Sequence, residues 1–384
     1  MTIGVNKNFE NIPNSYIRAF DEEISSVEGI IKFTLGEPDF DVPELVKEAA
    51  KQAIDDNYSH YGPTNGMPFY REEICSYLKR HYDLDYDPDK NIIVTAGVSQ
   101  GLSNAAHALL NPGEKVIVSS PYFTMYDTTI RSAYGKLVEV DTSQEGFKFT
   151  PEKLDEVLNQ EDDVKYVLLN YPNNPTGVSY TSDELRALAE VIEKHNVYCV
   201  SDEVYSALTY DGFKHASIAQ FIPDRTILLN GMSKAYAMTG YRLGYMAIPE
   251  DIYQTFYVVH QATLTCVSTP AQIAGAVALR DGDEEVEKMR RAYAERRNFL
   301  IPELEKLGFE IATPNGAFYL FIKIPERLNQ DSRKFALEIA KEARVGFIPG
   351  EAFGERGQGY LRMSYASSME ALEEGIRRLN NYLA

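Results

Sequence analysis

The chain has 384 residues with 57 acidic and 38 basic side chains, so its formal net charge is −19. That charge argues against a nucleic-acid backbone or an anionic membrane surface as the main partner. The three cysteines are widely separated and form neither a disulfide framework nor a zinc motif. No run of about 18 apolar residues predicts a transmembrane helix, and the N-terminus lacks the pattern of a signal peptide. We therefore expect a soluble, cytoplasmic protein of about two domains that binds no metal.

Five short apolar runs in the middle of the chain predict β-strands that are buried on both faces. They are rich in β-branched residues, are bounded by Asn, Gly or Pro, and span 91–96, 115–120, 164–170, 197–204 and 226–231. Amphipathic helical patterns lie between them. The clearest begins after Thr181, which can form a capping box with Glu184. Strands that alternate with helices predict a mostly parallel α/β sheet.

The two ends of the chain have a different pattern. A long charged helix is expected from about residue 283 to 307, and two further helices near 332–343 and 368–383. We expect residues 46–284 to form a large domain. Residues 1–45 and 285–384 should then form a smaller α+β domain that is assembled from both termini.

Polar segments follow the predicted strands at the point where each strand ends. They are Gly97–Gly101 (GVSQG), Tyr171–Gly177 (YPNNPTG), Asp202 with its neighbours, and Ser233-Lys234. In an open parallel sheet, ligands bind beyond the carboxyl ends of the strands. We therefore expect these segments to meet at one edge of the sheet.

Taken singly, these residues allow several interpretations. Ser99 in GVSQG matches the nucleophile elbow of an α/β-hydrolase, but the same segment also fits a phosphate-binding helix N-terminus or a plain turn. Asp202 is expensive to bury without a partner, and Lys234 would be a surface lysine in most proteins. Together, however, a phosphate cradle, a buried acid and a strand-end lysine favour a pyridoxal 5′-phosphate site.

Six motifs occur in a fixed order along nearly the whole chain: LGEPDF (35–40), YGPTNG (61–66), NPTG (174–177), SDEVY (201–205), SKAYAMTGYRLGY (233–245) and RMSYA (362–366). In this order they resemble the class I/II aminotransferases of fold type I, most closely the bacterial aromatic and N-acetyl-diaminopimelate enzymes. The resemblance implies a seven-stranded, mostly parallel sheet flanked by helices, together with the smaller α+β domain. It also implies a homodimer with shared active sites.

The resemblance implies a role for each matching residue. Lys234 would form the covalent Schiff base with pyridoxal 5′-phosphate and shuttle the proton. Asp202 would pair with the pyridine nitrogen, Tyr205 and Asn174 would hydrogen-bond the phenolic oxygen, and Phe123 would stack on the ring. Lys234, Asp202 and Tyr205 are thus the implied catalytic residues.

The cofactor phosphate has its own set of implied contacts. These are Val98, Ser99, Gln100, Arg242 and, from the neighbouring subunit, Tyr61. Many relatives also have a serine three residues before the lysine, where this chain has Gly231. Ser233 is the candidate to replace that contact.

Arg362 is the residue implied to bind the substrate α-carboxylate, with the backbone of Gly36 and with Asn174 beside it. The side-chain pocket is expected to be lined by residues 11–20 and 262–268, where Arg18 is the lone arginine. A dedicated dicarboxylate site is therefore not indicated, and an aromatic or broad specificity is favoured.

The resulting hypothesis is ping-pong transfer of an amino group between an L-amino acid and a 2-oxo acid. N-acetyl-diaminopimelate or aspartate aminotransferase and a C–S β-lyase on the same fold are alternatives. An α/β-hydrolase that uses Ser99 is an alternative of another class. A transcription regulator with an aminotransferase-like domain is disfavoured, because no basic module precedes Leu35.

Overall fold

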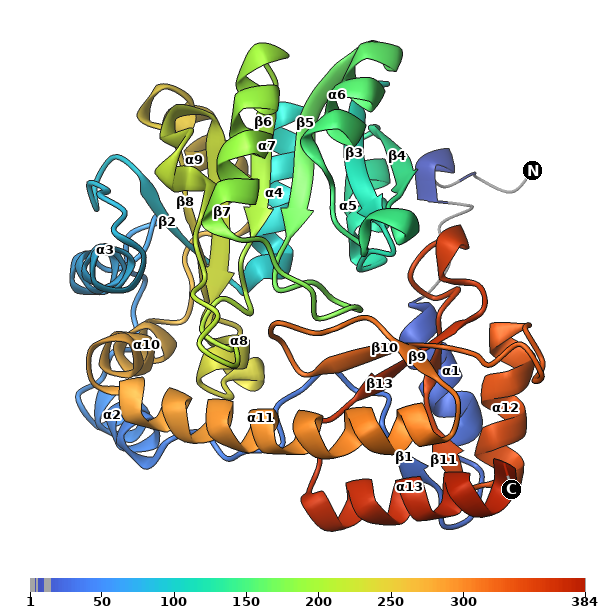
Figure 1. The fold of residues 1–384 in the computed structure, drawn as a ribbon. Helices are drawn as coiled ribbons and strands as arrows, with labels where there is room; N and C mark the ends of the chain where they lie inside the picture. The colour runs from blue at the N-terminus through green and yellow to red at the C-terminus, as the bar shows by residue number, and fades with distance from the viewer. Residues whose placement is uncertain (1–3, 5, 10–14, 384) are drawn as a thin grey trace.

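The computed structural model describes residue 4, residues 6–9 and residues 15–383, and its largest element is a seven-stranded sheet (Figure 1). The strand order is β2-β8-β7-β6-β5-β3-β4. Strand β8 runs antiparallel to both of its neighbours, and every other adjacent pair is parallel. The prediction of a mostly parallel seven-stranded sheet is confirmed. The strands are β2 (Ile92–Thr95), β3 (Lys115–Ser120), β4 (Lys136–Asp141), β5 (Val164–Asn170), β6 (Tyr198–Asp202), β7 (Thr226–Gly231) and β8 (Gly244–Ala247).

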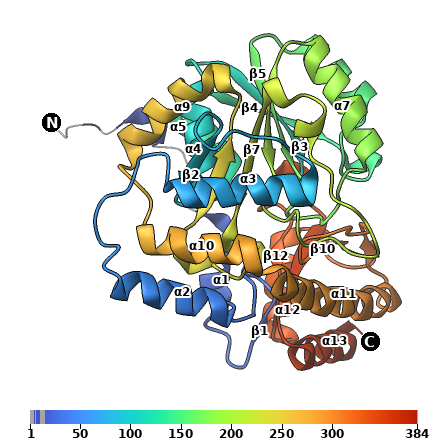
Figure 2. The ribbon, with the colours of Figure 1, turned by 90° about the vertical axis from the view of Figure 1, so that its left-hand side faces the viewer.

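Helices cover both faces of this sheet. Along β5, Val167 and Leu169 pack against α6 and α7, whereas Tyr166 and Leu168 face α4, α5 and α9, as the two-residue period of a strand requires. Figure 2 shows α2, α10 and α3 stacked along one side of the molecule. These helices are α2 (Glu44–Asp55), α3 (Pro68–Tyr82), α4 (Val98–Leu109), α5 (Met125–Ser132), α6 (Pro151–Gln160), α7 (Ser182–Lys194), α8 (Met232–Ala235), α9 (Glu250–Thr263) and α10 (Thr269–Asp281).

Both ends of the chain meet in a second layer of structure. A four-stranded antiparallel sheet has the order β12-β13-β10-β9, and β1 pairs with β11 in a separate parallel ribbon. The N-terminal α1 and β1 therefore lie among the C-terminal elements (Figure 1). The elements are α1 (Tyr16–Ile24), β1 (Ile31–Lys32), α11 (Asp283–Lys306), β9 (Glu310–Ile311), β10 (Tyr319–Lys323), α12 (Ser332–Glu342), β11 (Val345–Gly346), β12 (Ile348–Pro349), β13 (Tyr360–Ser364) and α13 (Met369–Leu383). The domain boundaries at residues 46 and 284 stay predictions.

Short 3₁₀ segments complete the described chain, at η1 (Lys7–Phe9), η2 (Ser143–Glu145), η3 (Ile218–Gln220), η4 (Pro223–Arg225), η5 (Thr239–Tyr241) and η6 (Glu355–Gly357). In the stretches that the structure describes, no helix has the length and apolarity that a membrane crossing needs.

Sequence patterns predicted five of the seven strands of the large sheet, and missed β4 and β8. The β4 segment lies at an edge of the sheet, where its charged residues remain partly or fully exposed, and these residues interrupt the apolar run in its sequence. The β8 segment is only four residues long and begins with glycine. Strand β6 also ends at Asp202, two residues before the predicted end, because a turn begins at Glu203.

The capping box at the start of α7 is formed as predicted. The backbone N–H of Glu184 donates to Thr181 Oγ1 at 3.3 Å, and the backbone N–H of Thr181 donates to Glu184 Oε2 at 2.7 Å. Two N–H groups at the helix start are thereby satisfied.

We predict that Thr181→Ala lowers the free energy of unfolding by about 1 kcal/mol, since it removes the side-chain cap of α7. Urea unfolding at neutral pH measures the effect. Ser15→Ala is the matched control, because Ser15 precedes α1 without making a side-chain cap bond. Equal stability of the two variants would contradict the prediction.

Candidate active site

The predicted site residues meet at the carboxyl edge of the large sheet. Strands β5, β6 and β7 are adjacent and parallel, and they carry Asn174, Asp202 and Lys234 at or just after their carboxyl ends. Strand β2 points the same way, because β8 is antiparallel to both β2 and β7. The start of α4 therefore lies at the same edge as the lysine.

Lys234 is held in a half-buried position on the short helix α8. Its Nζ donates a hydrogen bond of 2.6 Å to the carbonyl oxygen of Gly36 and lies 6.0 Å from the centre of the Tyr205 ring. Burial is the main cause that lowers the pKa of the Lys234 ammonium to about 8; the nearby Arg242 and Arg362 act in the same direction, and acidic groups oppose them. About a tenth of the lysine is then neutral at pH 7, which is the form that attacks an aldehyde.

Asp202 is a buried carboxyl with few partners. Its side chain accepts a hydrogen bond of 2.7 Å from the Tyr126 hydroxyl and a longer one of 3.3 Å from the Val204 N–H, and the residue is only 3% exposed. Burial raises the pKa of Asp202 from 3.8 to about 6, although both hydrogen bonds lower it. No cationic side chain of the described residues forms an ion pair with it. The carboxylate therefore suits a ligand that brings its own positive charge, such as a protonated ring nitrogen.

Arg362 is fully buried between two aromatic rings. Its guanidinium carbon lies 4.6 Å from the Tyr319 ring centre and 4.8 Å from that of Phe353. One terminal nitrogen donates to Asn174 Oδ1 at 3.1 Å and the other donates to the Thr34 carbonyl oxygen. Nε has no partner among the described residues. This buried, orphaned donor fits an incoming carboxylate.

The start of α4 and Arg242 lie together at one corner of the site. Gly97 precedes the helix with φ of +82°, and a Cβ there would lie 2.7 Å from Nη2 of Arg242, so only glycine lets the guanidinium lie so close. Arg242 is itself left-handed at φ +51° and donates to the carbonyls of Thr239 and Ala96 at 2.9 and 3.4 Å. The first N–H groups of a helix lack intrahelical acceptors, so this corner fits a phosphate.

Three of the residues implied to contact the phosphate begin α4. Val98 and Gln100 are half-buried and Ser99 is exposed, all in the first turn of α4. Gln100 Oε1 accepts the Ala96 N–H at 2.7 Å, which fastens the turn. Ser99 hydrogen-bonds no histidine among the described residues, so the α/β-hydrolase alternative lacks a triad.

Several other predicted residues lie around the same edge. The Tyr205 hydroxyl is 2.7 Å from the Tyr319 hydroxyl, and Phe123 packs edge-on against Tyr126 at 5.7 Å between ring centres. Ser233 is half-buried beside the lysine. At Gly231 a Cβ would come within 2.9 Å of the Leu243 carbonyl oxygen, so the backbone packs closely at this position.

Tyr61 is not part of this cluster. It is 86% exposed and lies beside a surface hollow that Tyr58 and Cys266 also line.

Sequence patterns missed three residues of the site. Tyr126 supports Asp202, and Tyr319 and Phe353 enclose Arg362. Tyr319 lies in an apolar run in which an aromatic residue predicts only core packing, and Tyr126 and Phe353 lie in mixed segments that match no motif. What marks these aromatic residues is their contact with Asp202 or Arg362, and a single sequence does not reveal contacts between residues so far apart along the chain.

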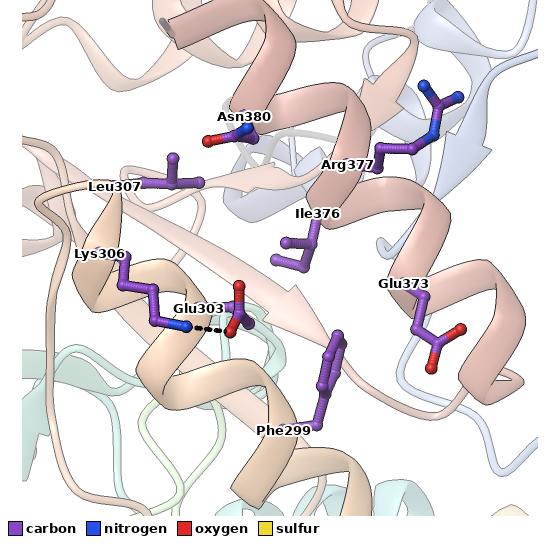
Figure 3. Close-up of a pocket in the computed structure, with 8 residues that line it drawn as sticks. All are labelled: Phe299, Glu303, Lys306, Leu307, Glu373, Ile376, Arg377 and Asn380. Atoms are coloured by element: carbon purple, nitrogen blue, oxygen red, sulfur yellow. Dashed lines mark hydrogen bonds and ion pairs between the residues drawn. The ribbon is translucent and has the colours of Figure 1, made fainter.

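A separate surface pocket lies between α11 and α13 (Figure 3). Its volume is about 310 Å³, and Lys306 forms an ion pair of 2.5 Å with Glu303 at its wall. It contains none of the predicted site residues. Its lining residues are Phe299, Glu303, Lys306, Leu307, Glu373, Ile376, Arg377 and Asn380.

Comparison with known proteins identifies the family. A model of the family "Aminotransferase class I and II" matches residues 28–379. The chain is 38% identical to the probable N-acetyl-LL-diaminopimelate aminotransferase of Bacillus subtilis, over 99% of this chain and 95% of that protein. It is also 38% identical to aromatic-amino-acid aminotransferase 2 of Thermococcus litoralis, over 97% of each chain.

Solved structures agree with this result. The aspartate aminotransferase of Thermus thermophilus with maleate superimposes with a TM-score of 0.93 at 36% identity, over 99% of this chain and all of that one. The predicted fold and reaction class are confirmed. The chain therefore belongs to the class I and II aminotransferases.

Proposed function

We propose that this aminotransferase uses pyridoxal 5′-phosphate and holds it at the carboxyl edge of the large sheet. The observation that carries the proposal is that Lys234, an amine of lowered pKa, and Asp202, a buried acid of raised pKa, lie at the carboxyl ends of adjacent parallel strands. When bound, pyridoxal 5′-phosphate supplies an aldehyde that exchanges amines and a ring that accepts electrons from the substrate α-carbon.

Each group of the site fits one part of the cofactor. Asp202 would hold the proton on the ring nitrogen, and Phe123 would pack against the ring face. Tyr205 and Asn174 would hydrogen-bond the phenolic oxygen. The phosphate would lie against Val98, Ser99, Gln100 and Arg242, with Ser233 as a further hydroxyl.

Lys234 is the group that moves the proton during transamination. Its Nζ would take the proton from the substrate α-carbon and deliver it to the aldehyde-derived carbon of the cofactor. A pKa of about 8 suits this exchange, since the amine gains and loses a proton close to neutral pH. The Gly36 carbonyl, 2.6 Å away, holds the protonated form in place.

The substrate would bind through its α-carboxylate. Arg362 presents its unsatisfied Nε and donates to Asn174, and Gly36 lies against Tyr319, whose ring packs on the guanidinium. Every amino acid carries this carboxylate, so it does not distinguish substrates. Of the segments expected to line the side-chain pocket, residues 11–14 are outside the described part of the chain, and Arg18 on α1 is exposed.

An aromatic or broad amino-acid specificity is favoured on this basis. Residues 262–268 carry no positive charge that could bind a second carboxylate. Relatives that act on aromatic amino acids, aspartate and, by its name, N-acetyl-LL-diaminopimelate all match this chain at similar identity. Aspartate, N-acetyl-diaminopimelate and β-elimination are therefore the alternatives to compare in one assay.

The proposal includes a homodimer in the cytoplasm. Three exposed apolar side chains, Ile54, Tyr58 and Tyr61, lie together around the hollow near Cys266. A second copy would cover this surface and bring its own Tyr61 to the phosphate. Light scattering of the purified protein measures the mass in solution, and a monomer would contradict the dimer.

We predict that the purified protein, reconstituted with pyridoxal 5′-phosphate, shows a visible absorption band that phenylalanine converts to the shorter-wavelength band of the amine form. The amino group then resides on the cofactor, and a 2-oxo acid is released. A band that phenylalanine leaves unchanged contradicts the aromatic specificity alone. Pyruvate released from cysteine or cystathionine would instead indicate a β-lyase.

Lys234→Ala should lower turnover by more than about a thousandfold, because both the covalent link and the proton carrier are lost. Thermal unfolding checks that the fold is retained. Lys214→Ala is the matched control, since Lys214 is exposed and forms no ion pair among the described residues. Near-normal turnover of Lys234→Ala would contradict the assignment.

Asp202→Asn should stabilise the cofactor-free protein at pH 7. The folded-state pKa of about 6 lies above the ordinary 3.8, so keeping Asp202 ionised opposes folding by up to about 3 kcal/mol above pH 6. This cost declines as the pH falls through 6 and is gone below about pH 4, where both states are protonated.

Urea unfolding at pH 7 and pH 4.5 tests this dependence, with Asp224→Asn as an exposed control. We expect the gain from Asp202→Asn to be smaller at pH 4.5, and saturating pyridoxal 5′-phosphate to reverse its sign at pH 7. A gain that is equal at both pH values contradicts the raised pKa.

A further inference from the structure

Tyr319 joins the two sheets at the active site. It lies on β10 of the four-stranded sheet, is fully buried, and its hydroxyl is 2.7 Å from that of Tyr205, which follows β6 of the large sheet. Burial raises the pKa of both tyrosines, so both are protonated at neutral pH. The two hydroxyls share one hydrogen bond, so one proton is left to reach another acceptor.

The same tyrosine also contacts the carboxylate-binding groups. Its ring lies under the Arg362 guanidinium at 4.6 Å, and a Cβ on Gly36 would come within 2.2 Å of the Tyr319 hydroxyl oxygen. The carbonyl of Gly36 in turn accepts the hydrogen bond from Lys234. Tyr319 is thus in contact with Arg362, Gly36 and Tyr205 at once.

We propose that Tyr319 is a positioning residue that directs the Tyr205 hydroxyl proton toward the phenolic oxygen of the cofactor and fixes Arg362 for the substrate carboxylate. The inference rests on the proposed function. When Tyr319 donates to the Tyr205 oxygen, the Tyr205 proton is free to point at the cofactor. Hydrogen bonds in such a chain strengthen one another, so the deprotonated phenolic oxygen is stabilised.

Tyr319→Phe tests the role of the hydroxyl separately from that of the ring. It removes the donor to Tyr205 but keeps the aromatic face under Arg362. We expect the pH midpoint of the visible band of the reconstituted protein to rise by roughly 0.2–0.5 pH unit. The KM for phenylalanine should change less than about threefold.

Tyr319→Leu removes the ring as well. We expect the same rise of the midpoint, together with an increase in KM of about tenfold or more, since a buried guanidinium loses its aromatic partner. Tyr365→Phe is the matched control, because Tyr365 is a buried tyrosine that follows β13 and donates to the Ala317 carbonyl at 3.2 Å. It should leave the midpoint and KM at the wild-type values.

A double-mutant cycle shows whether Tyr319 acts through Tyr205. Tyr205→Phe should raise the midpoint further than Tyr319→Phe does, and adding Tyr319→Phe to it should produce no additional shift. Additive shifts, or a Tyr319→Phe midpoint equal to that of wild type, would overturn this inference and leave the proposed function intact. A wild-type protein without any visible band after addition of pyridoxal 5′-phosphate would overturn both.

Discussion

The removal of charged groups from water at one edge of a sheet determines the chemistry of this protein. Lys234, Asp202 and Arg362 are each desolvated, and each responds in its own way. The lysine loses affinity for its proton, the acid gains affinity for one, and the guanidinium keeps an unused donor. In the proposed function, a cofactor with a cationic ring nitrogen and an electrophilic carbon compensates the first two groups, and the substrate carboxylate compensates the third. The folded chain is complementary to this pair of ligands before they bind.

The adjacent carboxyls of Asp202 and Glu203 differ in how many hydrogen bonds they accept. Glu203 is completely buried, and its oxygens accept hydrogen bonds from four side chains. Asp202, one residue earlier, has one side-chain donor. Glu203, whose hydrogen-bonding capacity is filled, fixes the turn that carries Tyr205. Asp202, which has fewer donors, can still accept a hydrogen bond from a ligand. The donors to Glu203 are Tyr171, Ser201, His215 and Ser217.

Local patterns were sufficient for five strands and the capped helix α7, because each depends on residues close in sequence. The candidate site residues followed instead from six motifs in a fixed order along nearly the whole chain. Strands β4 and β8 were missed, since an edge strand and a four-residue strand carry little apolar signal. Tyr126 and Tyr319 were missed for another reason. Their partners, Asp202 and Tyr205, are 76 and 114 residues away, and a single sequence does not report such pairings.

The pairing of β1 with β11 sets a condition on how the protein is made. Ile31 and Lys32 lie beside Val345 and Gly346, which a ribosome adds more than three hundred residues later. The N-terminal segment that contains β1 and Gly36 is therefore synthesised long before its partner β11, and the large sheet can form before β1 is paired. A chain interrupted before Arg362 already contains all seven strands of the large sheet but lacks the arginine that we propose to bind the substrate carboxylate. Under the proposed function, the substrate site is thus completed only in the last steps of synthesis.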